Sequence, residues 1–411
     1  MQPKAARSIP IEALRLIAVA GIEVFHTFQW TFQATCVGLP EYAPLAAFPH
    51  SGVLGFINLL GCWANEAFFM ISGYFLIASA ARAWDGGTTW KSQMQRTAQR
   101  LGKVVMPTAF YCVVALAWST VVSPIPDVTL STHYWYTLGL EFIWVYAATV
   151  FMAPWFGLAK SRLSQKSYTT TVIAVGILAF VVNGYIAAMS TTSTGEFSWL
   201  QKLMSAATYV IAFLIGGLLR DVTDVMDSDR AGALGMRSLA AILALATILE
   251  GALSFTGNLT AMAVLSYKST SLISFALAAA SLLFAATRRR ALGNPRNAGV
   301  IVTLSTATLG FYVMQSLTSS LWRPVFNTLL ANMQTYWSAK TARQLYVSSR
   351  VPSLASSLLW RFSSSMQLEA LSLASSSGNR HAAVRRQSRY TRGRFLRFIQ
   401  SLPTRCGEPL Q

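Results

Sequence analysis

The chain has 411 residues, of which 53% are hydrophobic and only 12% are charged. Lys plus Arg number 33 against 15 for Asp plus Glu, which gives a formal net charge of +18. Soluble domains carry about 25% charged residues, and this composition excludes a disordered chain, a collagen-like repeat and a small disulfide scaffold. Several apolar segments approach the length of about 20 residues that crosses a bilayer. The composition therefore predicts an all-α polytopic membrane protein embedded in a lipid bilayer.

The first apolar run covers about 12–32 and follows Lys4 and Arg7. It is long and has no small-residue cleavage site close behind it, which favours a spanning helix over a signal peptide. The later runs have mixed apolar composition without period-2 alternation, which favours helices over a barrel. They fall near 52–80, 103–123, 134–157, 168–190, 203–219, 236–256, 262–286 and 299–322. We expect about nine to ten transmembrane helices in one bundle.

Basic residues alternate between the two sides of this predicted topology. If the N-terminus is cytoplasmic, the outer segments 33–51, 124–133, 191–202 and 257–261 hold a single basic residue, Lys202. The positive-inside rule then predicts a multi-pass protein of the cell membrane with its N-terminus in the cytoplasm. The same rule explains the basic balance, so no nucleic-acid partner is expected. The four cysteines lack metal-ligand spacing, and no metal is expected.

The last part of the chain, 323–411, has a different composition. It carries thirteen Lys or Arg and two acidic residues, a net charge of +11. Nine spans would place this segment outside, against the charge rule. We therefore divide the chain into a membrane-embedded domain, 1–322, and a basic Ser/Arg-rich tail. The tail is interpreted as containing a weak tenth helix near 338–362, as a frameshifted terminus, or as a cytoplasmic tail that touches anionic lipid.

Four ionisable residues follow one face of the first predicted helix: Glu12, Arg15, Glu23 and His26. Arg15 and His26 are eleven positions apart, which leaves them about 20° from the same bearing and roughly 16 Å apart along the axis. Each acid precedes its basic partner by three positions, a spacing that allows pairing. A neutral imidazole can take a proton from a hydroxyl, and arginine suits phosphate groups. In the alternative interpretation, Arg15 extends to the lipid headgroups and His26 makes one buried hydrogen bond.

Five stretches in chain order extend this pattern. The first helix reads IEALRLIAVAGIEVFH, with Arg15 and His26 in register, and the second reads WANEAFFMISGYFLI, with Glu66 and Ser72-Gly73. A basic run precedes the third helix, and the later stretches read HYWYTLGLEFIWVYAATVFMAPW and TLGFYVMQ. Together they resemble the acyltransferase type 3 family of bacterial membrane O-acyltransferases, which modify cell-surface glycans. Two departures are Glu66, where Asp is usual, and Gln315, where the family has a His that can titrate.

The resemblance implies transfer of an acyl group, often acetyl, from cytoplasmic acyl-CoA to a hydroxyl of an extracytoplasmic glycan or lipid-linked sugar. Acyl-CoA would be a donor substrate, and no bound cofactor is expected. The predicted catalytic residues are His26, Glu23 and Glu66. The predicted donor-binding or structural residues are Arg15, Arg96, Arg100, Lys103, Ser72 and Gly73. The predicted acceptor-side residues are His133, Trp135, Glu141, Tyr312 and Gln315.

Several alternatives stay open at this point. The basic residues before the third helix serve equally as inside-positive anchors, and Trp135 as an interface anchor. Ser72 is interpreted as a packing residue, because serine in a membrane helix more often bonds its own backbone or packs. It is not interpreted as a nucleophile, because no Ser-His-Asp set is visible. A transient acyl-His26 intermediate is a variant of the mechanism. A transporter or flippase of a glycan or lipid intermediate is the alternative function, although no internal repeat supports it. A non-catalytic membrane scaffold is a third.

Overall fold

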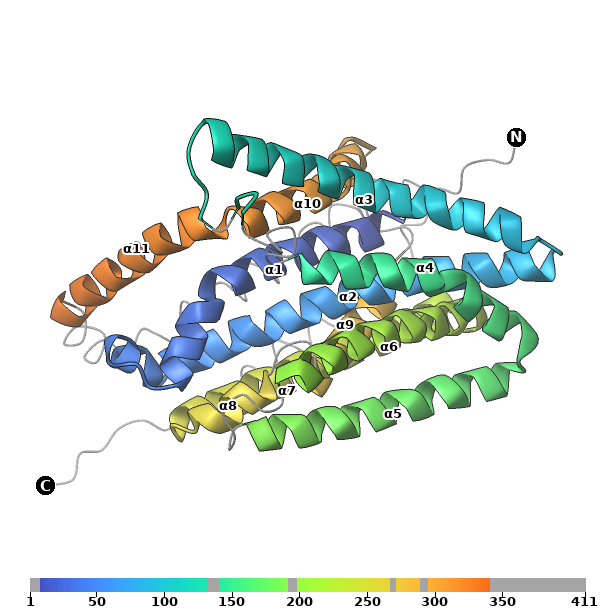
Figure 1. Cartoon of the computed structure of the whole chain (residues 1–411). Helices are drawn as coiled ribbons and strands as arrows, with labels where there is room; N and C mark the ends of the chain where they lie inside the picture. The colour runs from blue at the N-terminus through green and yellow to red at the C-terminus, as the bar shows by residue number, and fades with distance from the viewer. Residues whose placement is uncertain are drawn as a thin grey trace, which may run out of the picture. The chain divides into compact units, whose positions relative to one another are not determined.

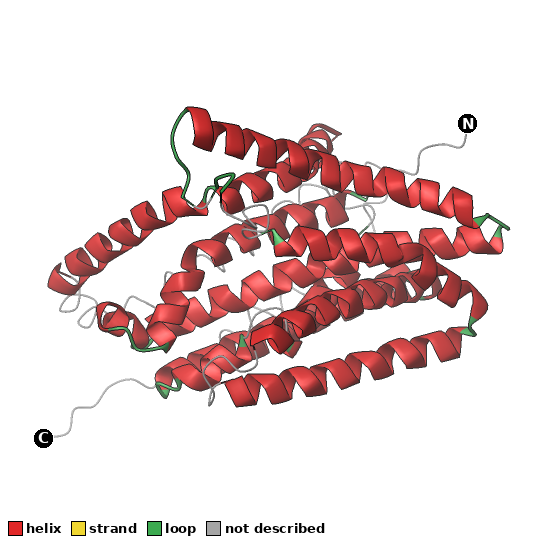
Figure 2. Cartoon of the chain, viewed as in Figure 1, coloured by secondary structure: helices red, strands yellow, loops and turns green. Residues whose placement is uncertain are grey.

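The computed structural model describes residues 8–126, 128–131, 140–190, 198–266, 271–288 and 295–340. Within these ranges every regular element is a helix (Figure 2). The first elements are α1 (Ile9–Cys36), the 3₁₀ helix η1 (Pro40–Ala46), α2 (His50–Asp85), α3 (Trp90–Val121), α4 (Glu141–Arg162) and α5 (Gln165–Ser190). The later ones are α6 (Ser198–Val225), α7 (Ser228–Phe255), α8 (Leu259–Leu265), α9 (Leu272–Thr287), α10 (Pro295–Leu317) and α11 (Ser319–Lys340).

Seven of the described helices are long and apolar enough to cross a membrane, namely α2, α3, α4, α5, α6, α7 and α10. The prediction of an all-α polytopic membrane protein is therefore confirmed. Helix α1 has 28 residues, also sufficient to span a bilayer, but it carries the polar stripe. The protein is a multi-pass membrane protein.

Two of the expected spans are interrupted. The run 262–286 was predicted as one helix, but it contains the end of the short helix α8 and then α9. The side chain of Ser271 accepts a hydrogen bond from the backbone N–H of Ser274, which caps the start of α9 within the apolar run. The run 299–322 breaks at Thr318, between α10 and α11. Pro324 lies inside α11 and has no N–H to donate to the Ser320 carbonyl one turn earlier.

Helix α11 also bears on the expected end of the membrane domain. The expected boundary after residue 322 falls inside α11, which runs from Ser319 to Lys340. Most of the expected tenth-helix segment, 338–362, lies outside the described residues. The division of the chain into a membrane domain and a tail, and the interpretations of the tail, therefore stay predictions.

Helix α2 forms the centre of the bundle and contacts α1, α4, α6, α7 and α9 (Figure 1). Its packing against α6 depends on two glycines, one on each helix: Gly73 of α2 faces α6, and Gly216 of α6 faces α2. A Cβ at Gly73 would collide with the backbone carbonyl of Phe213, and one at Gly216 would collide with the carbonyl of Met70. Small residues of this kind let two membrane helices approach closely. The two helices therefore form a tight backbone-to-backbone seam.

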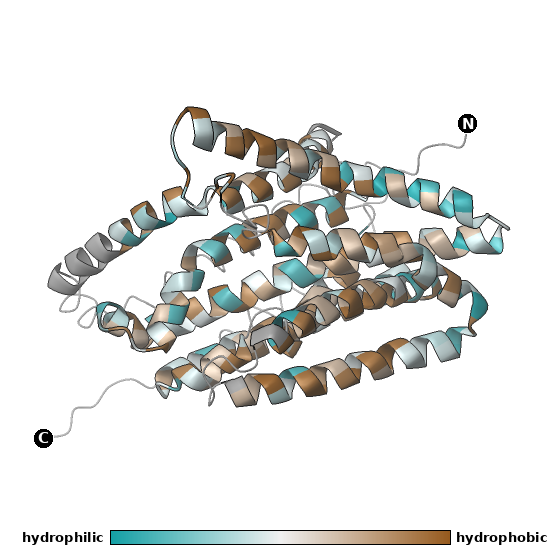
Figure 3. Cartoon of the chain, in the orientation of Figure 1, coloured by the Kyte–Doolittle hydropathy of each residue, from teal (hydrophilic) through white to brown (hydrophobic). Residues whose placement is uncertain are grey.

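The other side of α2 faces a more open group of helices. Helix α1 packs on α2 and α10, and α3 packs on α4 and α10. The N-terminal half of α3 is hydrophilic and its C-terminal half is hydrophobic (Figure 3). Helix α5 packs mainly on α6 and has an exposed apolar face in its middle part. The functional site lies on the side formed by α1, α2, α3, α4 and α10.

Candidate functional site

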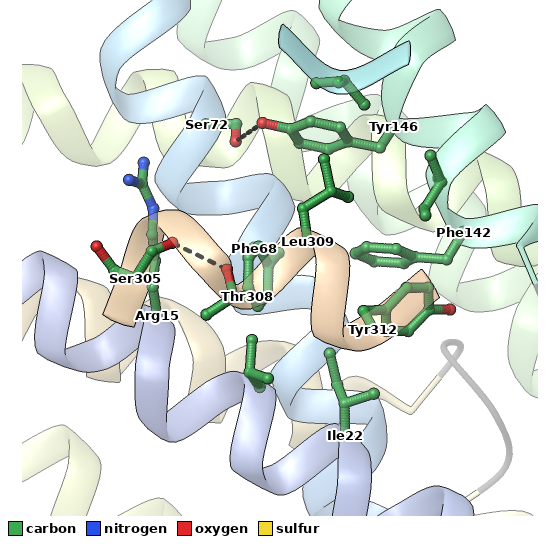
Figure 4. A pocket seen from close by; sticks show the side chains of 13 residues that line it. Arg15, Ile22, Phe68, Ser72, Phe142, Tyr146, Ser305, Thr308, Leu309 and Tyr312 are labelled. Atoms are coloured by element: carbon green, nitrogen blue, oxygen red, sulfur yellow. Dashed lines mark hydrogen bonds between the residues drawn. The ribbon is translucent and has the colours of Figure 1, made fainter. Parts of the chain in front are cut away.

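A cavity of about 200 Å³ lies between α1, α2, α3, α4 and α10 (Figure 4). One water needs only about 10–15 Å³ on a comparable scale, so this space is large enough for a substrate group. The cavity is lined by Arg15, Val19, Ile22, Phe68, Ser72, Val104, Phe142, Ile143, Tyr146, Ser305, Thr308, Leu309 and Tyr312. Three of the predicted site residues, Arg15, Ser72 and Tyr312, therefore meet at one space.

Arg15 occupies one end of the cavity, beside Ser305 of α10 (Figure 4). Its Nη1 atom donates to both carboxylate oxygens of Glu12, at 3.1 and 3.0 Å. Glu12 is buried, and the pair joins residues three apart on one helix. The predicted pairing of Glu12 with Arg15 is confirmed. The ion pair compensates a charge that would otherwise be costly to hold within a membrane helix.

Ser72 and Tyr146 join α2 to α4 across the cavity wall. Their hydroxyl oxygens are 2.9 Å apart and share one hydrogen bond (Figure 4). Ser72 is only 4% exposed, so its hydroxyl is engaged in a helix-to-helix contact. This arrangement agrees with the interpretation of Ser72 as a packing residue.

Aromatic side chains form the wall that leads away from Arg15. The Phe142 ring lies 6.4 Å from the Tyr146 ring and 5.5 Å from the Tyr312 ring, measured between centroids. Phe142 and Tyr146 are four residues apart on α4, so they share one face. Tyr146 belongs to the fourth stretch that resembles the family, but sequence reasoning assigned neither residue a role. Their spacing was the available signal, but it did not reveal which helix they would face.

His26 lies just beyond the Tyr312 end of the cavity. It is half-buried and does not line the cavity itself. Its ring centroid is 6.2 Å from that of Tyr312, which does line it. The positive charge of Arg323 acts on the imidazole. His26 is thus joined to the cavity through a single ring.

Other polar groups gather near His26. The charge of Glu23 acts on Tyr312, whose hydroxyl is hydrogen-bonded to Ser316. Within the described chain, the Oε1 atoms of Glu23 and Gln315 are buried without a hydrogen-bond partner. The predicted support of His26 by Glu23 therefore does not involve that oxygen atom. We refer to Glu23, His26, Tyr312, Gln315 and Arg323 as the outer cluster.

Two predicted residues of α2 lie outside the cavity lining. Glu66 is completely buried, and neither carboxylate oxygen has a hydrogen-bond partner in the described part of the chain. A buried carboxyl without partners is costly in the charged form. Gly73 faces α6 at the seam with Phe213 and does not contact the cavity. The predicted catalytic role of Glu66 stays a prediction.

The predicted basic residues occupy the N-terminal half of α3. Arg96 and Lys103 are exposed, while Arg100 is half-buried and donates from Nη2 to Ser79 Oγ at 3.4 Å. Val104, four residues after Arg100, lines the cavity. Because residues four apart share a helix face, the basic segment leads toward the cavity on one side of α3.

The remaining acceptor-side predictions concern the segment before α4. His133 and Trp135 lie outside the described residues. Glu141 is the first residue of α4, and its side chain is 68% exposed beside Lys202, with 3.7 Å between Nζ and Oε1. It does not line the cavity. An exposed pair of this kind contributes little to stability.

Apolar spanning helices surround a partly open cavity, with the Arg15–Glu12 ion pair at one end, in a multi-pass membrane protein. A family model described as an acyltransferase domain matches residues 10–360, most of the chain. The chain belongs to this family, the acyltransferase type 3 family, which confirms the resemblance seen in its motifs. It is therefore an acyltransferase of the membrane type. Comparison with curated proteins and with solved structures gave no match.

Proposed function

We propose that this protein transfers an acyl group, such as acetyl, from cytoplasmic acyl-CoA to a hydroxyl of an extracytoplasmic glycan or lipid-linked sugar. The observation that carries the proposal is the cavity with Arg15 at one end and Tyr312 at the other, where Tyr312 contacts His26. Arg15 precedes Ile22 by seven positions on α1, or about 10 Å along the axis. In the cell membrane, with the N-terminus in the cytoplasm, the Arg15 end lies nearer the donor and the His26 end nearer the acceptor.

The donor end is supported by its charge and its walls. CoA is polyanionic, and Arg15 together with Arg96, Arg100 and Lys103 supplies positive charge at the inner side of the bundle. Guanidinium groups bind phosphate in a two-pronged geometry. The apolar and aromatic walls beyond Arg15 suit the pantetheine arm and a short acyl chain, which carry no charge.

The transfer step requires a proton acceptor at the His26 end of the cavity. As the acceptor hydroxyl oxygen attacks the thioester carbonyl carbon, His26 takes the hydroxyl proton. The tetrahedral intermediate then loses its carbon–sulfur bond, CoA leaves as the thiolate, and the proton passes from His26 to that thiolate. Tyr312 and Gln315 are in a position to orient the acceptor, and Glu23 provides negative charge beside the imidazolium.

The proposal is tested by acetyl transfer in membranes that contain the wild type, His26→Ala or the control His50→Ala. His50 is exposed at the start of α2, away from the outer cluster, so the control removes the same imidazole elsewhere. With radiolabelled acetyl-CoA, we expect His26→Ala to lose label incorporation into envelope glycans by about 10²-fold or more and His50→Ala to retain it. Equal incorporation by all three proteins, at equal protein levels, would exclude His26 as the base.

Binding of labelled CoA separates this function from transport. A flippase of glycan intermediates has no need of CoA, whereas the proposed enzyme requires it. No finding favours the transporter alternative. Saturable CoA binding by the purified protein, weakened in Arg15→Gln, is the expected result.

A further inference from the structure

An aromatic contact joins α11 to α1, although almost three hundred residues separate the two rings in the sequence. Phe326 of α11 packs edge-to-face on Phe28, with 5.2 Å between ring centroids. Phe28 is two residues from His26, a spacing that does not put the two side chains on one face of α1. The start of α11 is placed by its neighbour α10, because Trp322 donates from Nε1 to the backbone carbonyl of Gln315, three residues after Tyr312. Arg323, the next residue, is close enough to His26 for its positive charge to act on that ring.

The positive charge of Arg323 has no ionic partner in the described chain. The ion pairs there are Arg15–Glu12, Lys160–Asp221, Lys202–Glu141 and Arg220–Asp224. The Nε atom of Arg323 is buried and lacks a hydrogen-bond partner among the described residues. The Trp322 ring, 5.8 Å from Cζ, offsets only part of this cost. Arginine does not lose its proton in proteins, so a bound anion would stabilise the charged Arg323 side chain.

The proposed reaction indicates what that anion is. An acceptor whose hydroxyl reaches His26 places its neighbouring substituent near Arg323. A guanidinium fork fits a carboxylate or a phosphate with two parallel hydrogen bonds. A negative charge present throughout binding compensates Arg323 from the moment the acceptor enters, whereas the oxyanion of the transition state would do so only transiently.

We propose that Arg323 binds a negatively charged group of the acceptor, so that the enzyme selects an acidic sugar over a neutral one. The inference rests on the proposed function for its acceptor chemistry, and it adds the charge of that acceptor. Buried polar atoms nearby agree with a ligand-binding surface, because the Oδ1 atom of Asn327, one turn beyond Arg323, is also buried and unpaired in the described chain.

The test measures binding by the full-length protein in nanodiscs without acyl-CoA, so that it does not depend on turnover. The probes are methyl glucoside, methyl glucuronide and glucose 1-phosphate, of which the first is neutral, the second carries a carboxylate and the third a phosphate. The variants are Arg323→Gln, Arg323→Lys and the control Lys202→Gln. Lys202 is an exposed cation of a predicted outer segment, so the control removes one positive charge outside the outer cluster.

For the wild type and Lys202→Gln, we expect an acidic probe to raise the melting temperature by about 2 °C or more and methyl glucoside to leave it unchanged. Arg323→Gln should lose this shift, and Arg323→Lys should keep part of it. The probe that stabilises the protein identifies a carboxylate or a phosphate acceptor group.

Two results would overturn the inference: no stabilisation of the wild type by either acidic probe, or equal stabilisation of Arg323→Gln. Its failure is distinguishable from failure of the proposed function. Acetyl transfer that depends on His26 without any acidic preference removes the role of Arg323 alone. Binding of an acidic sugar through Arg323 without acetyl transfer removes the enzymatic proposal and leaves the anion site.

Discussion

Filling the cavity with an indole should stop acyl transfer while leaving the bundle assembled. Thr308 lines the cavity, and its hydroxyl donates to the backbone carbonyl of Ser305 at 2.9 Å. Thr306 lies on the same helix but is exposed, and its hydroxyl donates to the carbonyl of Thr303 at 2.7 Å. Thr308→Trp and Thr306→Trp therefore lose equivalent local hydrogen bonds and differ only in where the indole points.

The magnitude follows from the size of the space. Tryptophan has the largest side chain, and the cavity measures only about 200 Å³, so an indole at position 308 takes up much of the room. Overpacking a core costs about 1–3 kcal/mol, which a multi-helix bundle can tolerate. Displacement of the thioester by about 1 Å reduces a rate by about 10²-fold, and we expect at least that loss of kcat/KM in Thr308→Trp.

The assay is transfer of radiolabelled acetyl from acetyl-CoA, with protein level and melting temperature measured in parallel. Thr306→Trp should retain activity within about threefold of the wild type, because its side chain is exposed and does not line the cavity. Full activity in Thr308→Trp would refute the assignment of this cavity to the substrate. Equal losses of activity in Thr308→Trp and Thr306→Trp would indicate a general disturbance of helix α10 and not a filled cavity.

Two further predictions concern helix α2. Gly73→Ala should lower the free energy of unfolding by about 1–3 kcal/mol, because its Cβ would collide with the Phe213 carbonyl. The control Gly184→Ala has open space around it and should be neutral or slightly stabilising in a thermal melt. Equal effects of the two substitutions would contradict the tight seam between α2 and α6. Ser72→Ala and Tyr146→Phe, combined in a double-mutant cycle, should give a coupling energy of about 0.5–1.5 kcal/mol. Ser72→Ala should retain acetyl transfer, because the Ser72 hydroxyl is bonded to Tyr146. Complete loss of activity in Ser72→Ala would indicate instead that Ser72 takes part in the reaction.

The helical class and most spans could be predicted because long apolar runs leave few alternatives in a membrane. The break between α8 and α9 was missed although residues 266–271 (SYKSTS) are polar, because the expected span 262–286 was drawn across them. The capping hydrogen bond of Ser271 is visible only once the chain is folded. The turn at Thr318 was missed because it lies among small polar residues (QSLTSS, 315–320), which a membrane helix also tolerates.

The site was predictable in part. Helical spacing correctly placed Arg15 and His26 along one helix, but only Arg15 lines the cavity, and Tyr312 lies between the cavity and His26. The role of Phe142 required knowledge of which face α4 turns toward α10. Arg323 was grouped with a basic tail, since a contact between α1 and α11 produces no local sequence signal. Long-range packing therefore determines what composition and spacing leave open.

Ser72 and Gly73 are consecutive residues of α2 that face different neighbours. Ser72 bonds Tyr146 in the cavity wall, and Gly73 packs directly against the backbone of α6. The substrate space and the tightest joint of the bundle are consequently one peptide bond apart. Any change that pushes α2 away from α6 also shifts the Ser72 hydroxyl and its hydrogen bond to Tyr146 in the cavity wall. Loss of turnover after substitution at this joint would then report a displaced wall, even though no altered atom meets the substrate.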